Sequence, residues 1–378
     1  MRVKARQTDD AESPVVGTVV IGTYDGGLVG LHASSGEQAF GYAPHAGCIK
    51  GVTCNDRGRC ASGGTDHMVR LFDLARGIEL GELQEHDDTV SCVEFSGAAN
   101  LVTGGADGLA CIWRCSDFEL LLKFRAHKTP ITCLAVHQSG KLMASAGRDS
   151  SIRLWDLMRG TSAANVPVDD VVESLSWSPS GNRLVALSAG AVTVVDVTMG
   201  GAAATWRSPS AGIMRIALSA AIFLRDGEVL MGDAKGELRV LEFQAKDGAP
   251  SLVETLVLPS DAKRVRVKGI VGSRHGAKGC LAFAVGTSSG RVEMWRFVPP
   301  KAGSASQECF QRLHEIETGV RLTTMSFWSG TAAQAAQEAN PLEAAMAELD
   351  DESVAQDMDR ADKAVTKSKK DLKRKRRA

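Results

Sequence analysis

A hydroxyl residue, a histidine and an aspartate recur together three times in the first half of the sequence. The sets are His45, Ser62 and Asp66; His86, Thr103 and Asp107; and His127, Ser145 and Asp149. These are the residue types of a hydrolytic triad, in which an imidazole activates a hydroxyl nucleophile and a carboxylate orients the ring. Such a triad needs an exposed hydroxyl, whereas each of these hydroxyls is followed by residues typical of a β-strand. We therefore interpret the sets as buried structural groups and predict that the protein is not an enzyme.

The spacing of these residues indicates what positions them. The three histidines recur every 41 residues, and the three aspartates are 41 and 42 residues apart. Each histidine precedes a β-type run such as "VSCVEF". Three further strand-like runs follow before the next histidine. Four short strands per repeat of about 40–45 residues, separated by polar turns, are typical of a propeller blade.

A tryptophan in the third strand completes two of the three sets. In such a blade the indole N–H donates to the hydroxyl, the hydroxyl to the imidazole and the imidazole to the carboxylate, so every buried polar group has a partner. The predicted complete tetrads are His86, Thr103, Asp107 and Trp113, and His127, Ser145, Asp149 and Trp155. The set of His45, Ser62 and Asp66 is partial because Phe72 replaces the tryptophan. We expect packing to hold this blade more than the hydrogen-bond chain does.

Three later segments show the same succession of strand-like runs and turns but lack the repeated His, hydroxyl and Asp residues. They lie at 171–197, 213–243 and 264–297. Two terminal segments complement one another, because residues 17–45 supply three strand-like runs and residues 319–328 supply one. Together they predict a closing blade that removes the open edges of the ring. The sequence therefore predicts an all-β, seven-bladed β-propeller over residues 17–328.

The segments outside the propeller differ from it in composition. We expect residues 1–16 to be a disordered N-terminus and residues 329–378 to form a C-terminal extension. Within that extension residues 340–358 predict a weak helix, for which docking and fraying remain alternatives. The tail at 363–378 holds nine of the 44 Lys and Arg residues and one of the 45 acids.

The basic tail favours nuclear import or attachment to RNA phosphates. The alternative is a solvated charge run that aids solubility. The residues predicted to form the nuclear localisation signal are Lys373, Arg374, Lys375, Arg376 and Arg377.

The sequence offers no residue pattern for a metal or a cofactor. The nine cysteines form no Cys-x-x-Cys pair and no zinc-like spacing with histidine, so we expect reduced thiols in a reducing compartment. The glycine-containing stretch "GSRHGAKG" at 272–279 lacks the Gly-Lys-Ser/Thr ending of a phosphate loop. Neither a secretory signal nor a membrane-spanning run is evident, so we expect no contact with membranes.

The sequence resembles WD-repeat proteins over 18–328. It is more narrowly similar to a family of nucleolar large-subunit ribosome-assembly factors, the p21-activated-kinase-interacting-protein-like or Mak-eleven-like family. The stretches that carry the resemblance are "VVIGTYDGGLVGLHA" at 19–33, "LVTGGADGLACIW" at 101–113, "AHKTPITCLAVHQSGKLMASAGRDSSIRLWDLMRG" at 126–160, "SWSPSG" at 176–181 and "RLTTMSFW" at 321–328, with a Lys-rich tail after them.

The resemblance implies a non-catalytic scaffold in assembly of the large (60S) ribosomal subunit, in the nucleus and nucleolus. It implies binding to pre-60S ribosomal particle proteins and, through the basic tail, to pre-rRNA. Negative regulation of p21-activated kinase through direct kinase binding is the alternative function. A ubiquitin-ligase receptor is disfavoured because "WDLMR" and "FDLAR" place their arginine one residue too late. We expect a monomeric propeller whose loops contact partners through Lys50, Asp88, Lys128 and Arg148.

Overall fold

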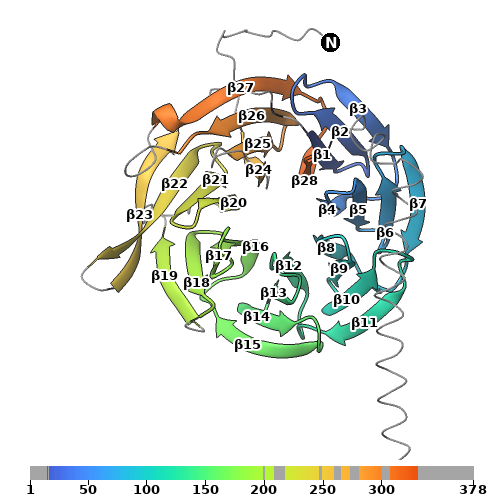
Figure 1. The fold of residues 1–378 in the computed structure, drawn as a ribbon, viewed down its shortest axis with the longest axis horizontal. Helices are drawn as coiled ribbons and strands as arrows, with labels where there is room; N and C mark the ends of the chain where they lie inside the picture. Colours follow the sequence, from blue (N-terminus) through green and yellow to red (C-terminus); the bar gives the residue numbers. More distant parts are fainter. Residues whose placement is uncertain are drawn as a thin grey trace, which may run out of the picture. The chain divides into compact units, whose positions relative to one another are not determined.

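The computed structural model describes residue 15 and residues 17–198, 201–207, 218–246, 249–258, 265–272, 281–299 and 307–330. These residues form seven four-stranded antiparallel sheets, which follow one another around a ring (Figure 1). The predicted all-β, seven-bladed propeller is thereby confirmed. The predicted helix at 340–358, the basic tail and most of the predicted N-terminal segment lie outside the described residues.

The first three blades along the chain contain the repeated His, hydroxyl and Asp residues. Blade 1 comprises β4 (Ile49–Cys54), β5 (Arg59–Gly64), β6 (Val69–Asp73) and β7 (Ile78–Leu83). Blade 2 comprises β8 (Val90–Ser96), β9 (Asn100–Gly105), β10 (Leu109–Arg114) and β11 (Leu120–Arg125). Blade 3 comprises β12 (Ile131–Val136), β13 (Leu142–Gly147), β14 (Ser151–Asp156) and β15 (Thr161–Pro167).

The next three blades are formed by the segments that have strand-like runs and turns but lack the repeated residues. Blade 4 comprises β16 (Val172–Trp177), β17 (Arg183–Ser188), β18 (Ala191–Asp196) and β19 (Gly201–Arg207). Blade 5 comprises β20 (Leu218–Arg225), β21 (Glu228–Asp233), β22 (Leu238–Lys246) and β23 (Ala249–Leu258). Blade 6 comprises β24 (Val267–Gly272), β25 (Leu281–Thr287), β26 (Arg291–Phe297) and β27 (Phe310–Glu317), with the short 3₁₀-helix η2 (Gln307–Cys309) before β27.

Blade 7 joins the two ends of the described chain. Its strand order is β28 (Leu322–Trp328), β1 (Thr18–Thr23), β2 (Leu28–His32) and β3 (Gln38–Tyr42). β1 pairs antiparallel with β28, and the register places Val20 opposite Ser326. Because the first strand of this blade comes from residues near 325 and the other three from residues near 30, the pairing closes the ring.

The hydrophobic core lies between neighbouring blades. One cluster joins Val102 and Ile112 of blade 2 to Ile131, Met143 and Trp155 of blade 3. Five further clusters join the other successive pairs from blades 1 and 2 to blades 6 and 7. Each fully buried aliphatic side chain of this kind contributes roughly 1.5–3 kcal/mol. Stacking against its neighbours therefore stabilises each blade, and the loops at its ends are held on a rigid support.

Among the residues that the structure describes, no helix has the length and apolar character to cross a membrane.

Candidate interaction face

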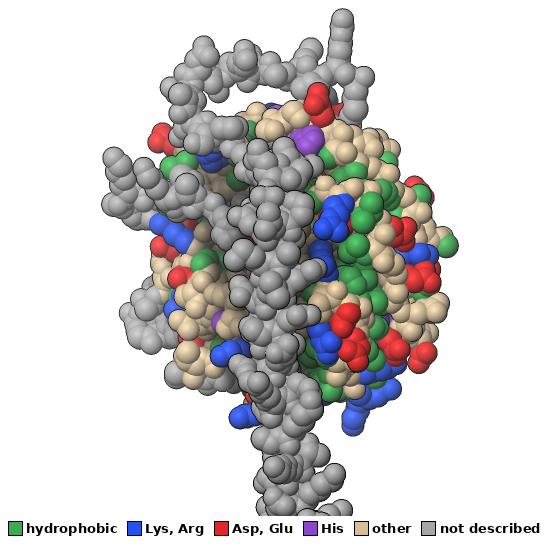
Figure 2. Space-filling view, turned by 45° about the vertical axis from the view of Figure 1, so that its right-hand side comes forward, with side chains coloured by type: hydrophobic (Ala, Val, Ile, Leu, Met, Phe, Trp, Pro, Cys, Tyr) green, Lys and Arg blue, Asp and Glu red, His purple; other side chains and the backbone are tan. Residues whose placement is uncertain are grey.

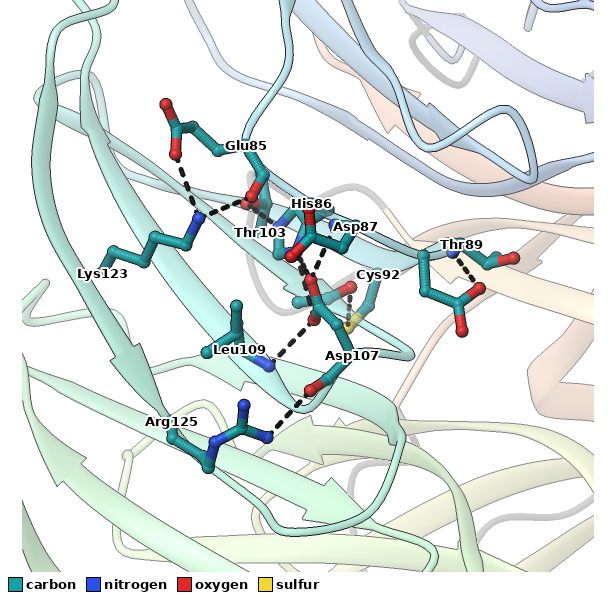
Figure 3. Close-up of polar contacts among 12 residues, drawn as sticks. Glu85, His86, Asp87, Thr89, Cys92, Thr103, Asp107, Leu109, Lys123 and Arg125 are labelled. Atoms are coloured by element: carbon teal, nitrogen blue, oxygen red, sulfur yellow. Dashed lines mark hydrogen bonds and ion pairs between the residues drawn. The ribbon is translucent and has the colours of Figure 1, made fainter.

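The predicted tetrads of blades 2 and 3 come together in the structure. In blade 2 the His86 Nδ1 lies 3.1 Å from Asp107 Oδ2, and its Nε2 lies 2.8 Å from Thr103 Oγ1 (Figure 3). Trp113 Nε1 donates to the same hydroxyl oxygen at 3.2 Å. Since an ionised carboxylate can only accept, the network assigns the hydrogen on His86 to Nδ1 and leaves Nε2 to accept from Thr103.

Blade 3 repeats this arrangement with a serine. His127 Nε2 lies 2.8 Å from Ser145 Oγ, which also accepts from Trp155 Nε1 at 2.9 Å. Ser145 and His127 are fully buried, so the hydroxyl is not available to a substrate. Burial lowers the pKa of His127, which keeps the ring neutral near pH 7. The set is a hydrogen-bonded chain in which the hydroxyl, the imidazole and the indole are buried, so it lacks the exposed nucleophile of a catalytic triad.

Blade 1 has the partial tetrad. His45 lies 2.9 Å from Asp66 Oδ1 and 2.8 Å from Ser62 Oγ. Phe72 is almost fully buried and stacks on Tyr42, with 5.0 Å between the ring centroids. An aromatic contact thus takes the place of the indole hydrogen bond.

Blade 6 uses a different buried polar network. Trp295 Nε1 donates to Glu293 Oε2 at 3.0 Å, and Arg291 Nε lies 3.3 Å from the other oxygen of Glu293. Arg291 also donates to Glu315 on β27 at 2.5 Å. A carboxylate therefore receives the indole hydrogen bond here, an arrangement that the sequence pattern did not indicate.

The tetrad aspartates also fix the loops. Asp107 accepts from the backbone N–H groups of Asp87 and Leu109, which tie the loop before β8 to the turn between β9 and β10. In that turn Gly108 has φ 79°, and a Cβ there would meet the carbonyl oxygen of His127 at 2.4 Å. Glycine thus allows the turn of blade 2 to hold the histidine loop of blade 3.

Two kinds of loop meet at one end of the blades. In five blades a backbone N–H from the turn between the second and third strands donates to the carbonyl of the residue just before the first strand. The donor and acceptor pairs are Thr65 and Cys48, Ala106 and Thr89, Arg148 and Pro130, Ser288 and Arg266, and Tyr24 and Arg321. We name the surface formed by these loops and turns the loop face.

The four residues predicted to contact partners all lie at this end of their blades and are exposed. Asp88 and Lys128 lie in the loops before β8 and β12, and Arg148 lies in the turn between β13 and β14. The expectation that Lys50 lies in a loop is wrong, because it is the second residue of β4. The predicted signal at Lys373 to Arg377 lies outside the described residues.

Charges of both signs are interspersed over the surface seen in Figure 2. Several form ion pairs, such as Lys123 with Glu85 at 3.1 Å and Arg70 with Glu82 at 2.6 Å. Exposed pairs of this kind contribute only about 0–1 kcal/mol to stability. Within the described ranges, no group of three or more His, Cys, Asp or Glu residues could hold a metal ion.

The sequence pattern did not indicate Lys268, which occupies in β24 the position that Lys50 occupies in β4. Both are second residues of innermost strands. Aligning blade 6 with blade 1 by strand would have revealed this equivalence, but blade 6 lacks the histidine and aspartate that mark the repeat.

Comparison with known proteins agrees with this architecture. The family model described as "WD domain, G-beta repeat" matches residues 77–114 and 118–156. The solved structure of U3-55K has a TM-score of 0.63 at 14% identity, covering 79% of this chain and 90% of that one, and supports the fold.

Two relatives have the same name, "p21-activated protein kinase-interacting protein 1-like". The protein from Danio rerio is 30% identical over 292 residues, which cover 77% of this chain and 73% of that protein. The protein from Gallus gallus is 27% identical over 321 residues, covering 84% and 81% of the two chains. The chain therefore belongs to the family of p21-activated protein kinase-interacting protein 1-like WD-repeat propellers.

Proposed function

We propose that this protein is a non-catalytic scaffold in assembly of the large (60S) ribosomal subunit, acting in the nucleolus. The observation that carries the scaffold function is the burial of the hydroxyl and the imidazole of every predicted triad. The hydroxyls of Ser62, Thr103 and Ser145 are fully buried and hydrogen-bonded, and the loop face presents exposed charged side chains instead. A rigid ring that displays loops but keeps its nucleophile-like groups inside suits binding better than catalysis.

The ribosomal part of the proposal is supported by the resemblance to large-subunit assembly factors and by the basic tail. In this proposal the loop face binds pre-60S proteins, and the tail adds a salt-sensitive, sequence-independent contact to pre-rRNA. The five residues Lys373 to Arg377 direct the protein to the nucleus.

Depletion of the protein from cells tests this function. We expect mature large subunits to fall and their precursor RNA to accumulate, while small-subunit processing continues at first. Re-expression of the wild-type chain should restore large subunits. A chain with Lys373, Arg374, Lys375, Arg376 and Arg377 all replaced by Ala should remain cytoplasmic and fail to do so.

The second candidate function is regulation of p21-activated kinase by direct binding. It is favoured by the relatives, whose name describes an interaction with that kinase. If depletion leaves both ribosomal subunits unchanged and raises kinase activity, the ribosomal proposal is wrong and the kinase function replaces it.

A further inference from the structure

Every innermost strand of the propeller has a β-bulge at its second residue. In β4, for example, Ile49 pairs with Gly64 and Gly51 with Gly63, so Lys50 has no partner of its own. The same shift occurs in all seven blades, and each innermost strand lies nearest the axis of the ring (Figure 1). The seven bulge residues are Lys50, Ser91, Thr132, Glu173, Ser219, Lys268 and Thr323. We name this set the bulge ring.

The position of the bulge gives these residues a common setting. A bulge leaves its extra residue outside the ladder and redirects the side chain. All seven bulges fall at the start of the innermost strand, next to the loop face. The charged members of the bulge ring therefore determine which ligands the centre of the loop face attracts.

Cations gather on three consecutive blades of the ring. Blade 6 contributes Arg266 and Lys268, blade 7 contributes Arg321, and blade 1 contributes Lys50. Lys50 and Arg321 are exposed, and Arg266 and Lys268 are half-buried. We name these four residues the basic crescent.

The other three cations are close enough to act on Lys268. Burial lowers the pKa of Lys268, and the charges of Arg266, Lys50 and Arg321 lower it further. Glu173, the acidic member of the bulge ring, acts on Lys268 in the opposite direction but is the weakest of these influences. Like charges that repel one another at a partly buried site favour an anion between them.

Glu173 acts only weakly on the crescent, and no carboxylate in the described part of the chain forms an ion pair with it. None of its four side chains forms an ion pair with a described residue. The Nε of Arg266 is buried and has no hydrogen-bond partner there. Other arginines, such as Arg153 and Arg239, also have a buried Nε without a partner, so it is the lack of ion pairs that points to an external anion at the crescent.

Exposed apolar side chains border the crescent. Tyr24 is 50% exposed, and the Arg321 guanidinium lies over its ring, 4.5 Å from the centroid. The Tyr24 backbone N–H donates to the Arg321 carbonyl at 2.9 Å, which fixes the turn beside the cation. Val265, next to Arg266, is 44% exposed. Tyrosine and arginine are enriched among the anchors of protein interfaces.

The rest of the loop face argues against an extended polyanion. Glu173 lies at the bulge of blade 4, and Asp169 and Asp170 lie just before it. Asp87 and Asp88 are exposed before β8. A nucleic acid strand that crossed the ring from the crescent would approach these carboxylates, whereas a compact anionic group would meet only the cations.

We propose that the basic crescent binds an acidic segment of a protein partner, with a carboxylate or phosphate held among Lys50, Arg266, Lys268 and Arg321. An apolar side chain of the same segment packs on Tyr24 and Val265. This deepens the proposed scaffold function by naming the chemistry of one partner. It rests on that function only in treating the loop face as a binding surface.

Binding of synthetic peptides to the purified full-length chain tests the proposal. The probes are fluorescein-labelled peptides of one length that contain a central Tyr and four flanking residues, which are Glu, phosphoserine or Gln. A 12-nucleotide oligouridylate is the nucleic acid probe. Fluorescence anisotropy should show binding of the Glu or the phosphoserine peptide, or of both, and at least about tenfold weaker binding of the Gln peptide.

A matched pair of variants assigns the binding to the crescent. The double variant Lys50→Gln and Lys268→Gln removes two crescent charges. The control, Arg57→Gln with Lys141→Gln, removes two exposed charges from turns between first and second strands, at the other end of the blades. We expect the first to weaken peptide binding about tenfold or more and the second to change it less than about twofold. If the first variant fails to fold, Arg321→Gln replaces it. Arg321 is exposed, and its substitution should likewise weaken peptide binding.

Three results would overturn the proposal: no binding of either acidic peptide, equal losses in the two double variants, or crescent-dependent binding of the oligouridylate that is tighter than that of the peptides. These results do not depend on ribosome assembly. If the peptides bind as expected and depletion leaves ribosomal subunits unchanged, the ribosomal function fails while the binding site stands.

Discussion

The indole Nε1 of Trp155 donates a hydrogen bond to Ser145 Oγ at 2.9 Å, and Ser145 in turn contacts the imidazole of His127. The hydroxyl therefore links an aromatic ring in β14 to the loop before β12. Blade 1 has Phe72 at the tryptophan position and lacks this link. The two blades thus provide an internal comparison for the contribution of one hydrogen bond.

Trp155→Phe should lower the free energy of unfolding by about 1–3 kcal/mol, because the buried Ser145 hydroxyl loses its donor and the smaller ring leaves space. Urea denaturation followed by circular dichroism measures the loss. In a Ser145→Ala background the same substitution should cost less, since the hydrogen bond is already absent. Equal costs in the two backgrounds would show that the indole contributes through packing alone.

Acidification should destabilise the fold. Burial lowers the pKa of both His127 and His314, so below the ordinary histidine value of about 6.5 the unfolded chain binds protons that the folded chain does not. Burial alone would raise the pKa of Asp149, but hydrogen bonds from Ser151 and His127 outweigh it and lower that pKa. This carboxylate therefore stabilises the fold above its unfolded pKa near 3.9, and that stability is lost as pH falls through the lower folded value.

Urea denaturation at a series of pH values measures this dependence. The free energy of unfolding should fall from pH 7 to pH 5, and fall again below pH 4. A rise in stability over the first interval would contradict the neutral state assigned to the buried histidines.

The buried thiols should resist alkylation in the folded protein. Burial raises the pKa of Cys111 and Cys133 to about 12 and that of Cys115 to about 11. Iodoacetamide reacts with the thiolate, so labelling at pH 8 should be slower than in the urea-unfolded chain by about a thousandfold for Cys111 and Cys133 and by about a hundredfold for Cys115. Mass spectrometry of tryptic peptides gives the rates. Rapid labelling of Cys133 without unfolding would mean that blade 3 opens locally.

Loss of β28 should prevent folding, whereas loss of the segment after it should not. A chain that ends at residue 318 leaves β1 without its neighbour and exposes a strand edge, so we expect an insoluble or misfolded product. A chain that ends at Gly330 retains all seven sheets and should melt cooperatively. Soluble, cooperative unfolding of the shorter chain would contradict the role of blade 7 in closing the ring.

The repeat made part of this structure predictable from the sequence. His86, Thr103, Asp107 and Trp113 mark their blade because the hydrogen-bond chain needs those residue types at fixed positions. Blade 7 was also predictable, because the two terminal segments supply complementary strands. In blade 4 no such chain exists: Ala186 stands opposite Leu175, at the position that Ser145 has in blade 3, and only the strand rhythm indicated the sheet.

The basic crescent could not be predicted in the same way. A bulge is a property of the pairing between two strands, so the sequence around Lys268 does not show that this residue lies close to Arg266, Lys50 and Arg321. Arg321 and Lys50 come together only because β28 pairs with β1, which brings it beside β4. The buried network of Arg291, Glu293 and Trp295 was hidden for a related reason, since its partner Glu315 comes from a separate strand.

The pairing of β1 with β28 also determines when, during synthesis, the propeller is first able to bind partners. At synthesis rates of about 5–20 residues per second, roughly 15–60 s separate the emergence of β1 from that of β28. Throughout that interval β1 has a free edge, and the crescent lacks Arg321. Partners that need the crescent therefore meet a binding surface only after translation has passed the last strand, so ring closure acts as a check that the propeller is complete.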